Sequence, residues 1–347
     1  MEKLSRIVQD FVKIEGACST GIVTTKTLEG GPPSSELDYV LPGAKSAVSF
    51  AVAIDQETIL PYLTKKDRLT YEQEYIRISA LASGIAFHLS NYLEQKGYPS
   101  VPVADNCVYR QESSEGLYDY SPDVAHRYLA VRSGVGYMGL SGNIITGEQG
   151  AAITLAATVT TAELIPTDPL PPENNYCDNC RLCMASCVSG FMHPEEKTNI
   201  KLDNFEFEYS KRRHYGRCDC VCSGYTGLHS SGKWSTWSPG RYKIPESDDK
   251  INAEQARMID RYAKWPKAPG GRYFILTDDK LRTSCGNCQL VCCPDKKERK
   301  TRYKFLTESG VAVQNSDGNI EAVSPEYAKK MLENMPNSRK ILYENLG

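Results

Sequence analysis

The residues best suited to chemistry in this chain are cysteines, which gather in two short runs. The first run has the spacing C-x2-C-x2-C-x3-C and consists of Cys177, Cys180, Cys183 and Cys187. The second run comes about a hundred residues later and consists of Cys285, Cys288, Cys292 and Cys293. Three thiolates spaced as in the first run can bind one [4Fe–4S] cluster, while the fourth cysteine reaches a second cluster. The two runs together predict a pair of [4Fe–4S] clusters.

Closely spaced cysteines also occur in zinc sites and in disulfide frameworks. Zinc sites use C-x2-C pairs, so one such run by itself would be compatible with zinc. Two runs with this spacing favour a pair of clusters. Eleven of the thirteen cysteines lie within residues 177–293. Thiols packed so closely in a chain of 347 residues indicate metal binding in a reducing environment rather than disulfides.

Composition limits the classes of protein that fit. The length of 347 residues predicts about two domains, and a hydrophobic fraction of 40% is sufficient to bury a core. The net charge of −2 provides no overall attraction for nucleic acid or anionic lipid. Residues 1–16 have the pattern of an amphipathic helix, without the apolar region of a signal peptide, and no membrane-spanning apolar run follows. We therefore expect a cytoplasmic protein without a membrane partner.

Strands and helices that could position a cofactor precede the cysteines. Residues 18–25, 47–54 and 101–105 have the apolar and β-branched composition of strands. Residues 68–96 repeat apolar side chains at helical spacing, and a shorter helix is expected at 123–131. This mixture of elements predicts an α+β fold for the first half of the chain.

A glycine-rich segment at residues 133–143 follows the shorter helix. Glycines leave the backbone amides open to close approach by a ligand, although a tight connection between elements would use them equally well. The segment does not fit a dinucleotide-binding fingerprint, because a helix precedes it and a strand follows it. Residues 144–146 and 151–159 are expected to form a buried pair of strands.

Proline-rich residues 166–172 predict a linker and the main boundary in the chain. We therefore expect an α+β domain over residues 1–165 and a cluster domain over residues 166–300. The cluster domain contains a long aromatic insert at 190–283, which could cap a cofactor pocket, form an interface or cover the clusters. Residues 301–347 are expected to form a helical C-terminal tail.

The order of these motifs resembles that of the epoxyqueuosine reductases and the reductive dehalogenases. The resemblance rests on residues 41–49, on residues 126–143, on the linker and on both cysteine runs. In this superfamily a nitroreductase-like, cobalamin-binding domain precedes a ferredoxin-like domain with two [4Fe–4S] clusters. The resemblance implies the same architecture and the same cofactors for this chain.

The resemblance also implies which residues bind the cofactors. The first cluster would take three cysteines of the first run and one from the second: Cys177, Cys180, Cys183 and either Cys292 or Cys293. Cys292 is favoured because it keeps the family spacing after Cys288. The glycine-rich segment would contact cobalamin through Gly134, Gly136, Tyr137, Met138, Gly139, Ser141 and Asn143.

The second cluster would take Cys187, Cys285, Cys288 and one cysteine from the middle of the insert. Cys218, Cys220 and Cys222 are the candidates there. Cys222 is favoured because a tyrosine follows it three residues later, as in the family pattern. Cys218 is its main rival.

Candidate proton donors come from the end of the third expected strand and the loop after it. In epoxyqueuosine reductases an aspartate at a strand end donates the proton, and Asp105 occupies such a position. About fifteen extra residues separate Asp105 from the next helix. An ungapped alignment instead places Tyr120 there, beside Asp119. Reductive dehalogenases use a tyrosine as the acid, so Asp105, Tyr120 and Asp119 are all retained.

The chain departs from epoxyqueuosine reductases in several places. Ile76 stands where the family has a histidine, and Leu140 stands where it has a lysine after the glycine-rich turn. The helical-repeat domain that helps those enzymes hold transfer RNA has no counterpart after Pro294. We therefore do not expect transfer RNA as the substrate.

These observations predict a cobalamin-dependent iron–sulfur reductase acting on an unidentified small molecule. Its electrons would come from an external low-potential donor of the ferredoxin or flavodoxin type. One alternative is a dicluster electron-transfer protein that reduces a partner corrinoid or redox protein. The other is a true epoxyqueuosine reductase in transfer RNA modification.

Overall fold

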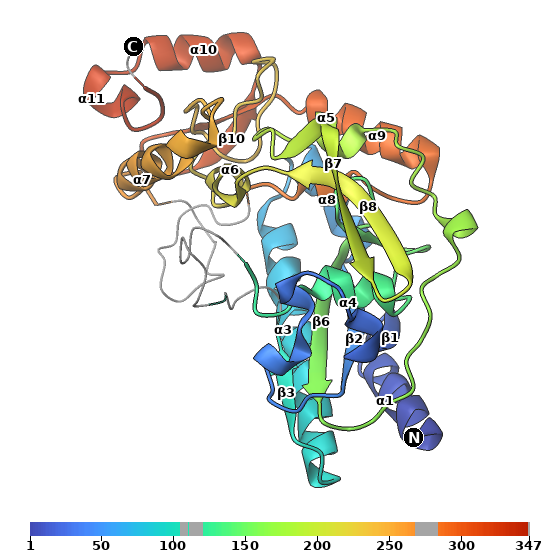
Figure 1. The fold of residues 1–347 in the computed structure, drawn as a ribbon. Coiled ribbons are helices and arrows are strands. Elements are labelled where there is room, and N and C mark those ends of the chain that lie inside the picture. The colour runs from blue at the N-terminus through green and yellow to red at the C-terminus, as the bar shows by residue number, and fades with distance from the viewer. Residues whose placement is uncertain (105–109, 111–120, 268–283, 346–347) are drawn as a thin grey trace.

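An antiparallel sheet lies at the centre of the N-terminal half. The computed structural model describes residues 1–104, 110, 121–267 and 284–345. Within them, four strands pair in the order β1-β2-β6-β3 (Figure 1). Their bounds are β1 Ser19–Thr24, β2 Ser46–Ala53, β3 Ser100–Val103 and β6 Ile153–Thr160. The strands expected at 18–25, 47–54 and 101–105 are confirmed to within two residues.

Helices pack on both faces of this sheet because its side chains alternate in direction. Val48 and Phe50 of β2 share one core with α1 (Glu2–Ile14) and α3 (Leu69–Gln95). Ala47 and Ala51 point to the opposite face and pack with α4 (His126–Arg132). The long helix is confirmed, and the shorter one begins three residues later than expected.

The expected pairing of residues 144–146 with 151–159 is wrong. The first segment forms β5 (Ile144–Ile145), which pairs with β4 (Tyr137–Met138). The second segment forms β6, which instead pairs with β2 and β3. The reason is local: the turn between β4 and β5 contains Gly142 with φ +74°, a conformation that suits glycine, so the shorter segment folds back on its predecessor.

The cluster region is not separated from the sheet by a core boundary. The core that contains Phe50 also contains Trp237 from the insert, Leu290 of α8 (Asn287–Leu290) and Leu306. Tyr62 of α2 (Ile59–Leu63) donates a hydrogen bond of 2.8 Å to the backbone oxygen of Cys285. The linker thus connects two parts of the chain that share one apolar core.

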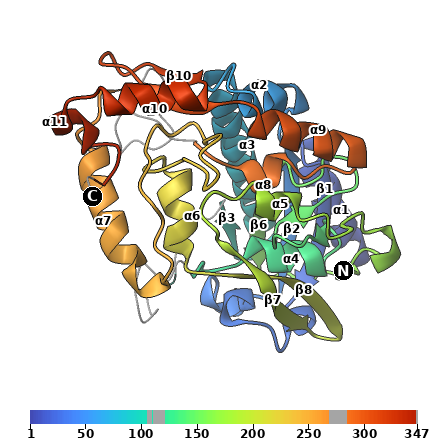
Figure 2. The same ribbon diagram turned by 90° about the horizontal axis from the view of Figure 1, so that it is seen from above.

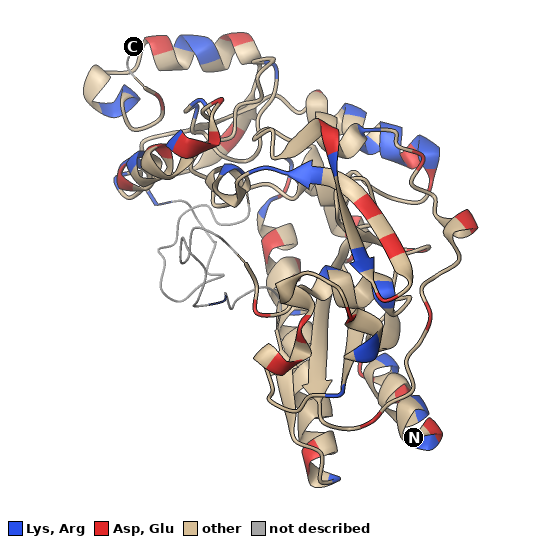
Figure 3. Cartoon of the chain, in the orientation of Figure 1, with Lys and Arg blue, Asp and Glu red and all other residues tan. Residues whose placement is uncertain are grey.

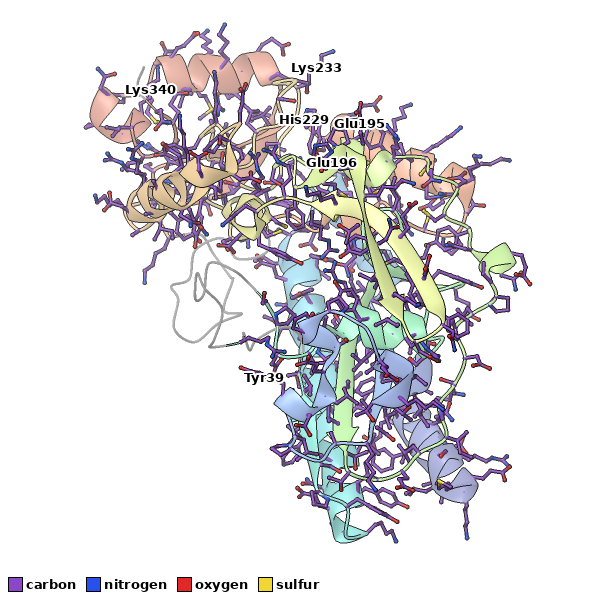
Figure 4. The ribbon with its side chains drawn as sticks, in the orientation of Figure 1. Tyr39, Glu195, Glu196, His229, Lys233 and Lys340 are labelled. Atoms are coloured by element: carbon purple, nitrogen blue, oxygen red, sulfur yellow. The ribbon has the colours of Figure 1, made fainter. Side chains whose placement is uncertain are left out.

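The described part of the insert, residues 190–267, contains a long hairpin, two α-helices and irregular chain. Its elements are β7 (Met192–Leu202), β8 (Phe205–Arg212), α6 (Tyr215–Cys222) and α7 (Ile251–Tyr262). Trp237 Nε1 donates to the backbone oxygen of Tyr62 at 3.0 Å. His229, which is labelled in Figure 4, lies in the insert. Its ring stacks on that of Trp234 with centroids 4.6 Å apart. Within the described residues, these tryptophans of the insert extend the main core.

The C-terminal tail is not entirely helical, contrary to the expectation. Its helices are α9 (Lys296–Thr307), α10 (Pro325–Glu333) and α11 (Asn337–Lys340). Between them, β9 (Val311–Gln314) and β10 (Ile320–Val323) form an antiparallel hairpin. Alternating valines in β9 and a turn with Gly318 at φ +87° favour this hairpin. No helix in the described part of the chain is both long and apolar enough to cross a membrane.

Candidate iron–sulfur centre

Four thiols from the two cysteine runs converge beside α5 (Leu182–Ala185), which lies next to α8 (Figure 2). Burial raises the pKa of Cys183 to about 12, and the nearby thiols of Cys292, Cys177 and Cys180 add to that shift. Burial likewise raises the pKa of Cys292 to about 11, with Cys177 and Cys180 contributing. These mutual effects place the four thiols within electrostatic range of one another. We call Cys177, Cys180, Cys183 and Cys292 the first thiol group.

Cys293 lies apart from this group although it is adjacent to Cys292. Its Sγ is 3.5 Å from the backbone oxygen of Asp295. Burial raises the pKa of Cys293, and the strongest charge effects on it come from side chains of α9 and Asp295, not from cysteines. Of the two candidates in the second run, the structure therefore brings Cys292 to the first thiol group.

A second thiol group forms where the end of the first run meets α6 and α8. Its members are Cys187, Cys218, Cys222, Cys285 and Cys288. Burial raises the pKa of Cys288 well above its usual value, and Cys187, Cys218 and Cys285 raise it further. The Sγ atoms of Cys218 and Cys222 are 3.5 Å apart. Five thiols thus lie where one [4Fe–4S] cluster uses four.

Helical periodicity separates the three cysteines of α6. Cys218 and Cys222 are four residues apart and share one face of the helix. Cys220 points elsewhere, is fully buried and packs with Tyr242 and Met258 in a small separate core. Cys220 is therefore a core residue, whereas both Cys218 and Cys222 face the second thiol group.

We expect Cys218→Ala and Cys222→Ala each to keep two clusters, because either thiol is one helical turn from the other and can replace it. The double variant should lose about half of its iron. Iron and sulfide per chain after anaerobic reconstitution measure the effect, with Cys220→Ala as the matched control. If one single variant alone loses half of its iron, that cysteine is the only ligand from α6.

Protein donors point at several of these sulfurs. The backbone N–H of Leu140 donates to Cys177 Sγ at 3.3 Å, and Arg299 Nη1 donates to Cys180 Sγ at 3.4 Å. Asn143 Nδ2 lies 3.7 Å from Cys288 Sγ. Donors to cluster sulfurs and to their ligands adjust reduction potentials, generally by stabilising the more negative state. Local spacing did not indicate Leu140 or Arg299 as donors to sulfur, and Asn143 was expected to contact cobalamin instead.

The glycines of residues 133–143 are required by contacts within the protein. A Cβ on Gly136 would meet the backbone oxygen of Ile145 at 2.8 Å, and one on Gly134 would meet that of Asp168 at 2.4 Å. A Cβ on Gly142 would meet the ring of Tyr209 at 2.8 Å. These three glycines are therefore explained by a tight connection between elements, without a bound ligand.

The other expected cobalamin contacts in this segment vary in exposure. Met138, Gly139 and Ser141 are buried, and Tyr137 is half-buried. The backbone oxygen of Ser141 accepts a hydrogen bond from Arg212 Nη2 at 3.2 Å. Within the described residues, this segment does not by itself define a cradle for cobalamin, and the assignment stays a prediction.

Gly150 supports the first thiol group from the sheet side. A Cβ there would meet the backbone oxygen of Cys292 at 2.4 Å, and Gly150 has φ +65°. Gly150→Ala should displace Cys292, lower the iron content and destabilise the fold by about 1–3 kcal/mol. Gly147→Ala is the matched control, because a Cβ on Gly147 meets nothing within 4 Å. Iron analysis and thermal unfolding test this, and equal behaviour of the two variants would contradict it.

A network of arginines and tyrosines beside the second thiol group was not expected from the sequence. Arg127 Nη2 lies 3.4 Å from the hydroxyl oxygens of Tyr128, Tyr209 and Tyr215. Arg212 Nη1 donates to Tyr215 at 3.3 Å. Burial opposes ionisation of Tyr215, but the charges of Arg212 and Arg127 outweigh it, so the pKa of Tyr215 lies below its usual value.

Arg212 links this network to the glycine-rich segment and to a thiol of the second thiol group. Its Nη2 donates to Asn143 Oδ1 at 3.2 Å, and Asn143 Nδ2 points at Cys288 Sγ. Arg212 thus orients the amide of Asn143. No pattern along the chain could have indicated this contact, because it joins residues 69 positions apart.

The three candidate proton donors, Asp105, Asp119 and Tyr120, lie outside the described residues. The strand that was expected to extend to residue 105 ends at Val103. The backbone oxygen of Ala104 lies 2.7 Å from His126 Nε2, at the start of α4. The roles of the three candidates stay predictions.

Within the described ranges, no three His, Cys, Asp or Glu side chains converge tightly enough to enclose a single metal ion. A [4Fe–4S] cluster has different needs, because it carries one thiolate on each iron. Its ligands therefore stand farther apart than the four ligands of a zinc ion.

The fold and the two thiol groups define a mixed α/β protein with cysteines arranged for iron–sulfur binding. No family model matches the chain. Among curated proteins, the epoxyqueuosine reductase of Atelocyanobacterium thalassa (isolate ALOHA) is 26% identical over 182 residues, covering 52% of this chain and 54% of that protein. The epoxyqueuosine reductase of Listeria monocytogenes serovar 1/2a is 32% identical over 108 residues, covering 27% and 28%.

One solved structure agrees with the fold over almost the whole chain. A catabolic reductive dehalogenase in complex with 3-bromo-4-hydroxybenzoic acid aligns with a TM-score of 0.50 and 11% identity. The alignment covers 99% of this chain and 38% of that one. The chain matches about half the length, or less, of the curated relatives. The curated matches make the chain similar in sequence to epoxyqueuosine reductases, as the motifs predicted, and the structural match shows a fold shared with a reductive dehalogenase.

Proposed function

We propose that this chain is an iron–sulfur oxidoreductase that passes electrons through two [4Fe–4S] clusters to a corrinoid and then to a small-molecule substrate. The observation that carries the proposal is the convergence of cysteines from distant segments into two thiol groups. The first group would hold one cluster. Cys187, Cys285, Cys288 and one thiol of α6 would hold the other.

The two thiol groups differ in their access to solvent. Electrons would therefore enter at the cluster of the first thiol group, the outer cluster, and pass to the cluster of the second thiol group, the inner cluster. Cys180 of the first group is exposed. In the second group, burial is the leading cause that raises the pKa of both Cys187 and Cys288. When bound, the clusters would supply single-electron transfer at low potential, and a corrinoid would supply reduced cobalt. The chain itself would orient the ligands, donate hydrogen bonds to sulfur and exclude water from the inner site.

The domain assignment belongs to the same proposal. Residues 1–165 would form a nitroreductase-like, cobalamin-binding domain and residues 166–300 a ferredoxin-like cluster domain. Anaerobic reconstitution with iron, sulfide and hydroxocobalamin tests the proposal. We expect about eight iron atoms and about one cobalt atom per chain after gel filtration. A chain that retains no iron would overturn it.

A second candidate is a dicluster electron-transfer protein that reduces a partner corrinoid or redox protein. It is favoured by the glycine-rich segment, whose Gly134, Gly136 and Gly142 are accounted for by neighbours within the protein. Retention of iron without cobalt in the same experiment would select this candidate.

Epoxyqueuosine reduction is a third candidate, because the curated relatives carry that name. The chain matches only part of their length, so their name alone does not establish this activity for it. Complementation of a strain that lacks epoxyqueuosine reductase would test this candidate directly.

A further inference from the structure

Helix α9 concentrates positive charge in a protein whose net charge is −2 (Figure 3). Its sequence, KKERKTRYKFLT, contains six basic residues and one acidic residue, Glu298. A basic run of this kind is often only a solvated helix face. Whether this helix can also bind a partner depends on its position relative to the thiols.

The basic residues of α9 divide into a buried side and an exposed side. Arg299 and Arg302 are buried together with Leu306. Four lysines, Lys296, Lys297, Lys300 and Lys304, are all exposed. At 3.6 residues per turn these lysines fall within an arc of about 100° on the side away from the core. We call them the α9 lysine face.

The charge of this face is largely uncompensated. Lys296 Nζ pairs with Asp178 at 2.9 Å. Among the described residues, no carboxylate forms an ion pair with Lys297, Lys300 or Lys304. The two buried arginines are already engaged, because Arg299 pairs with Asp178 at 3.1 Å and Arg302 with Glu298 at 3.0 Å.

The α9 lysine face adjoins the exposed edge of the first thiol group. Arg299, on the inner side of α9, donates to Cys180 Sγ at 3.4 Å, and Cys180 is exposed. Arg181, the next residue, is also exposed and has φ +59°, so the loop turns back sharply at this edge. Lys296, at the start of the lysine face, pairs with Asp178, two residues before Cys180. This end of the face therefore lies near an exposed ligand of the cluster proposed at the first thiol group.

We propose that the α9 lysine face is the docking site for an acidic single-electron donor protein of the ferredoxin or flavodoxin type. The inference rests on the proposed function, because it requires a cluster at the first thiol group. Electron transfer slows steeply with distance, so a donor must approach where a cluster ligand reaches the surface. Complementary charge raises the association rate and orients the encounter. In each transfer the donor is oxidised by one electron and the outer cluster is reduced by one.

RNA also binds lysine-rich surfaces. The donor protein is favoured because Lys296 pairs with Asp178, two residues before the exposed Cys180, and electron transfer needs such nearness to a cluster ligand whereas RNA binding does not. The face also occupies one side of a single helix, which provides few phosphate contacts. RNA binding is therefore treated as an outcome of the test.

The test uses the reconstituted full chain and the double variant Lys297→Glu/Lys300→Glu. Its matched control is Lys329→Glu/Lys330→Glu on α10, which makes the same charge change on another exposed helix. Stopped-flow absorbance follows cluster reduction under anaerobic conditions, first by a reduced acidic ferredoxin and then by reduced methyl viologen. We expect the α9 variant to react with ferredoxin at least about tenfold more slowly at low salt. High salt should bring the ferredoxin rates of the α9 variant and the wild type closer together. Methyl viologen should reduce the wild type, the α9 variant and the α10 control at equal rates.

The outcomes separate this inference from the proposed function. An unchanged ferredoxin rate in an α9 variant with intact clusters would overturn the inference and leave the proposed function standing. If the α9 variant keeps the wild-type ferredoxin rate but binds transfer RNA more weakly than the wild type, the face is an RNA site instead. Wild-type protein that holds no cluster would overturn the proposed function and the inference with it.

Discussion

Cys292→Ser should lose the first cluster, whereas Cys293→Ser should retain both. The two cysteines are adjacent, yet only Cys292 lies within electrostatic range of Cys177, Cys180 and Cys183. A serine hydroxyl is a poor ligand for iron compared with a thiolate. Cys292→Ser should therefore fall from about eight to about four iron atoms per chain. Iron and sulfide analysis with the anaerobic absorption spectrum measures the loss.

Cys293→Ser is the matched control because it makes the same chemical change one residue away. Cys293 is 4% exposed and its Sγ contacts the backbone oxygen of Asp295, a partner that a serine hydroxyl can keep. Electron paramagnetic resonance of the reduced proteins adds a second readout. Cys292→Ser should keep only the signal of the cluster at the second thiol group. Loss of iron from Cys293→Ser with full iron in Cys292→Ser would reverse the ligand assignment.

Lys65→Met should stabilise the protein, and more strongly at pH 6 than at pH 9. Lys65 is 8% exposed, and its Nζ donates a hydrogen bond to Ser309. Among the described residues, no carboxylate forms an ion pair with it. Burial without a counter-charge lowers the pKa of Lys65 to about 7. The folded protein therefore resists the charged form of this lysine.

The pH dependence follows from the protons that each state binds. Between about pH 7 and the usual lysine pKa of about 10.5, the unfolded chain holds a proton on Lys65 that the folded chain lacks. Wild-type stability should therefore rise with pH in this window, by at most about 1.4 kcal/mol per pH unit. Below about pH 7 the full penalty applies. There we expect Lys65→Met to gain at least about 2 kcal/mol, after allowing for the lost hydrogen bond to Ser309.

Thermal unfolding of the reconstituted protein at pH 6 and pH 9 measures this effect. Lys66→Met is the matched control, because Lys66 is the next residue and is exposed. Its unfolding temperature should change little at either pH, whereas Lys65→Met should gain a few degrees at pH 6 and less at pH 9. An equal gain for Lys65→Met at both values would mean that hydrophobic packing, not lysine ionisation, causes the stabilisation.

The sequence by itself determined the elements and the kind of chemistry. Apolar alternation located the central strands β2 and β6, and helical spacing located α3, because these patterns follow from burial of one face of each element. The spacing of the first cysteine run indicated [4Fe–4S] ligands because the geometry of a cluster limits how its ligands can be placed along a short loop. The resemblance to the superfamily, which the curated relatives support, rested on the same local motifs.

Tertiary structure alone decided which of these residues meet. It brought Cys292 rather than Cys293 to the first thiol group, and it removed Cys220 from the candidates by burying it in a separate core. It packed other protein atoms beside Gly136. The glycine pattern in the sequence could not show whether this position faces protein or a ligand. It also placed Arg299 of α9 beside Cys180, which lies 119 positions earlier in the chain. The physical reason is the same in each case: contacts between distant segments depend on how the helices and the sheet pack into one core, and local spacing carries no record of that packing.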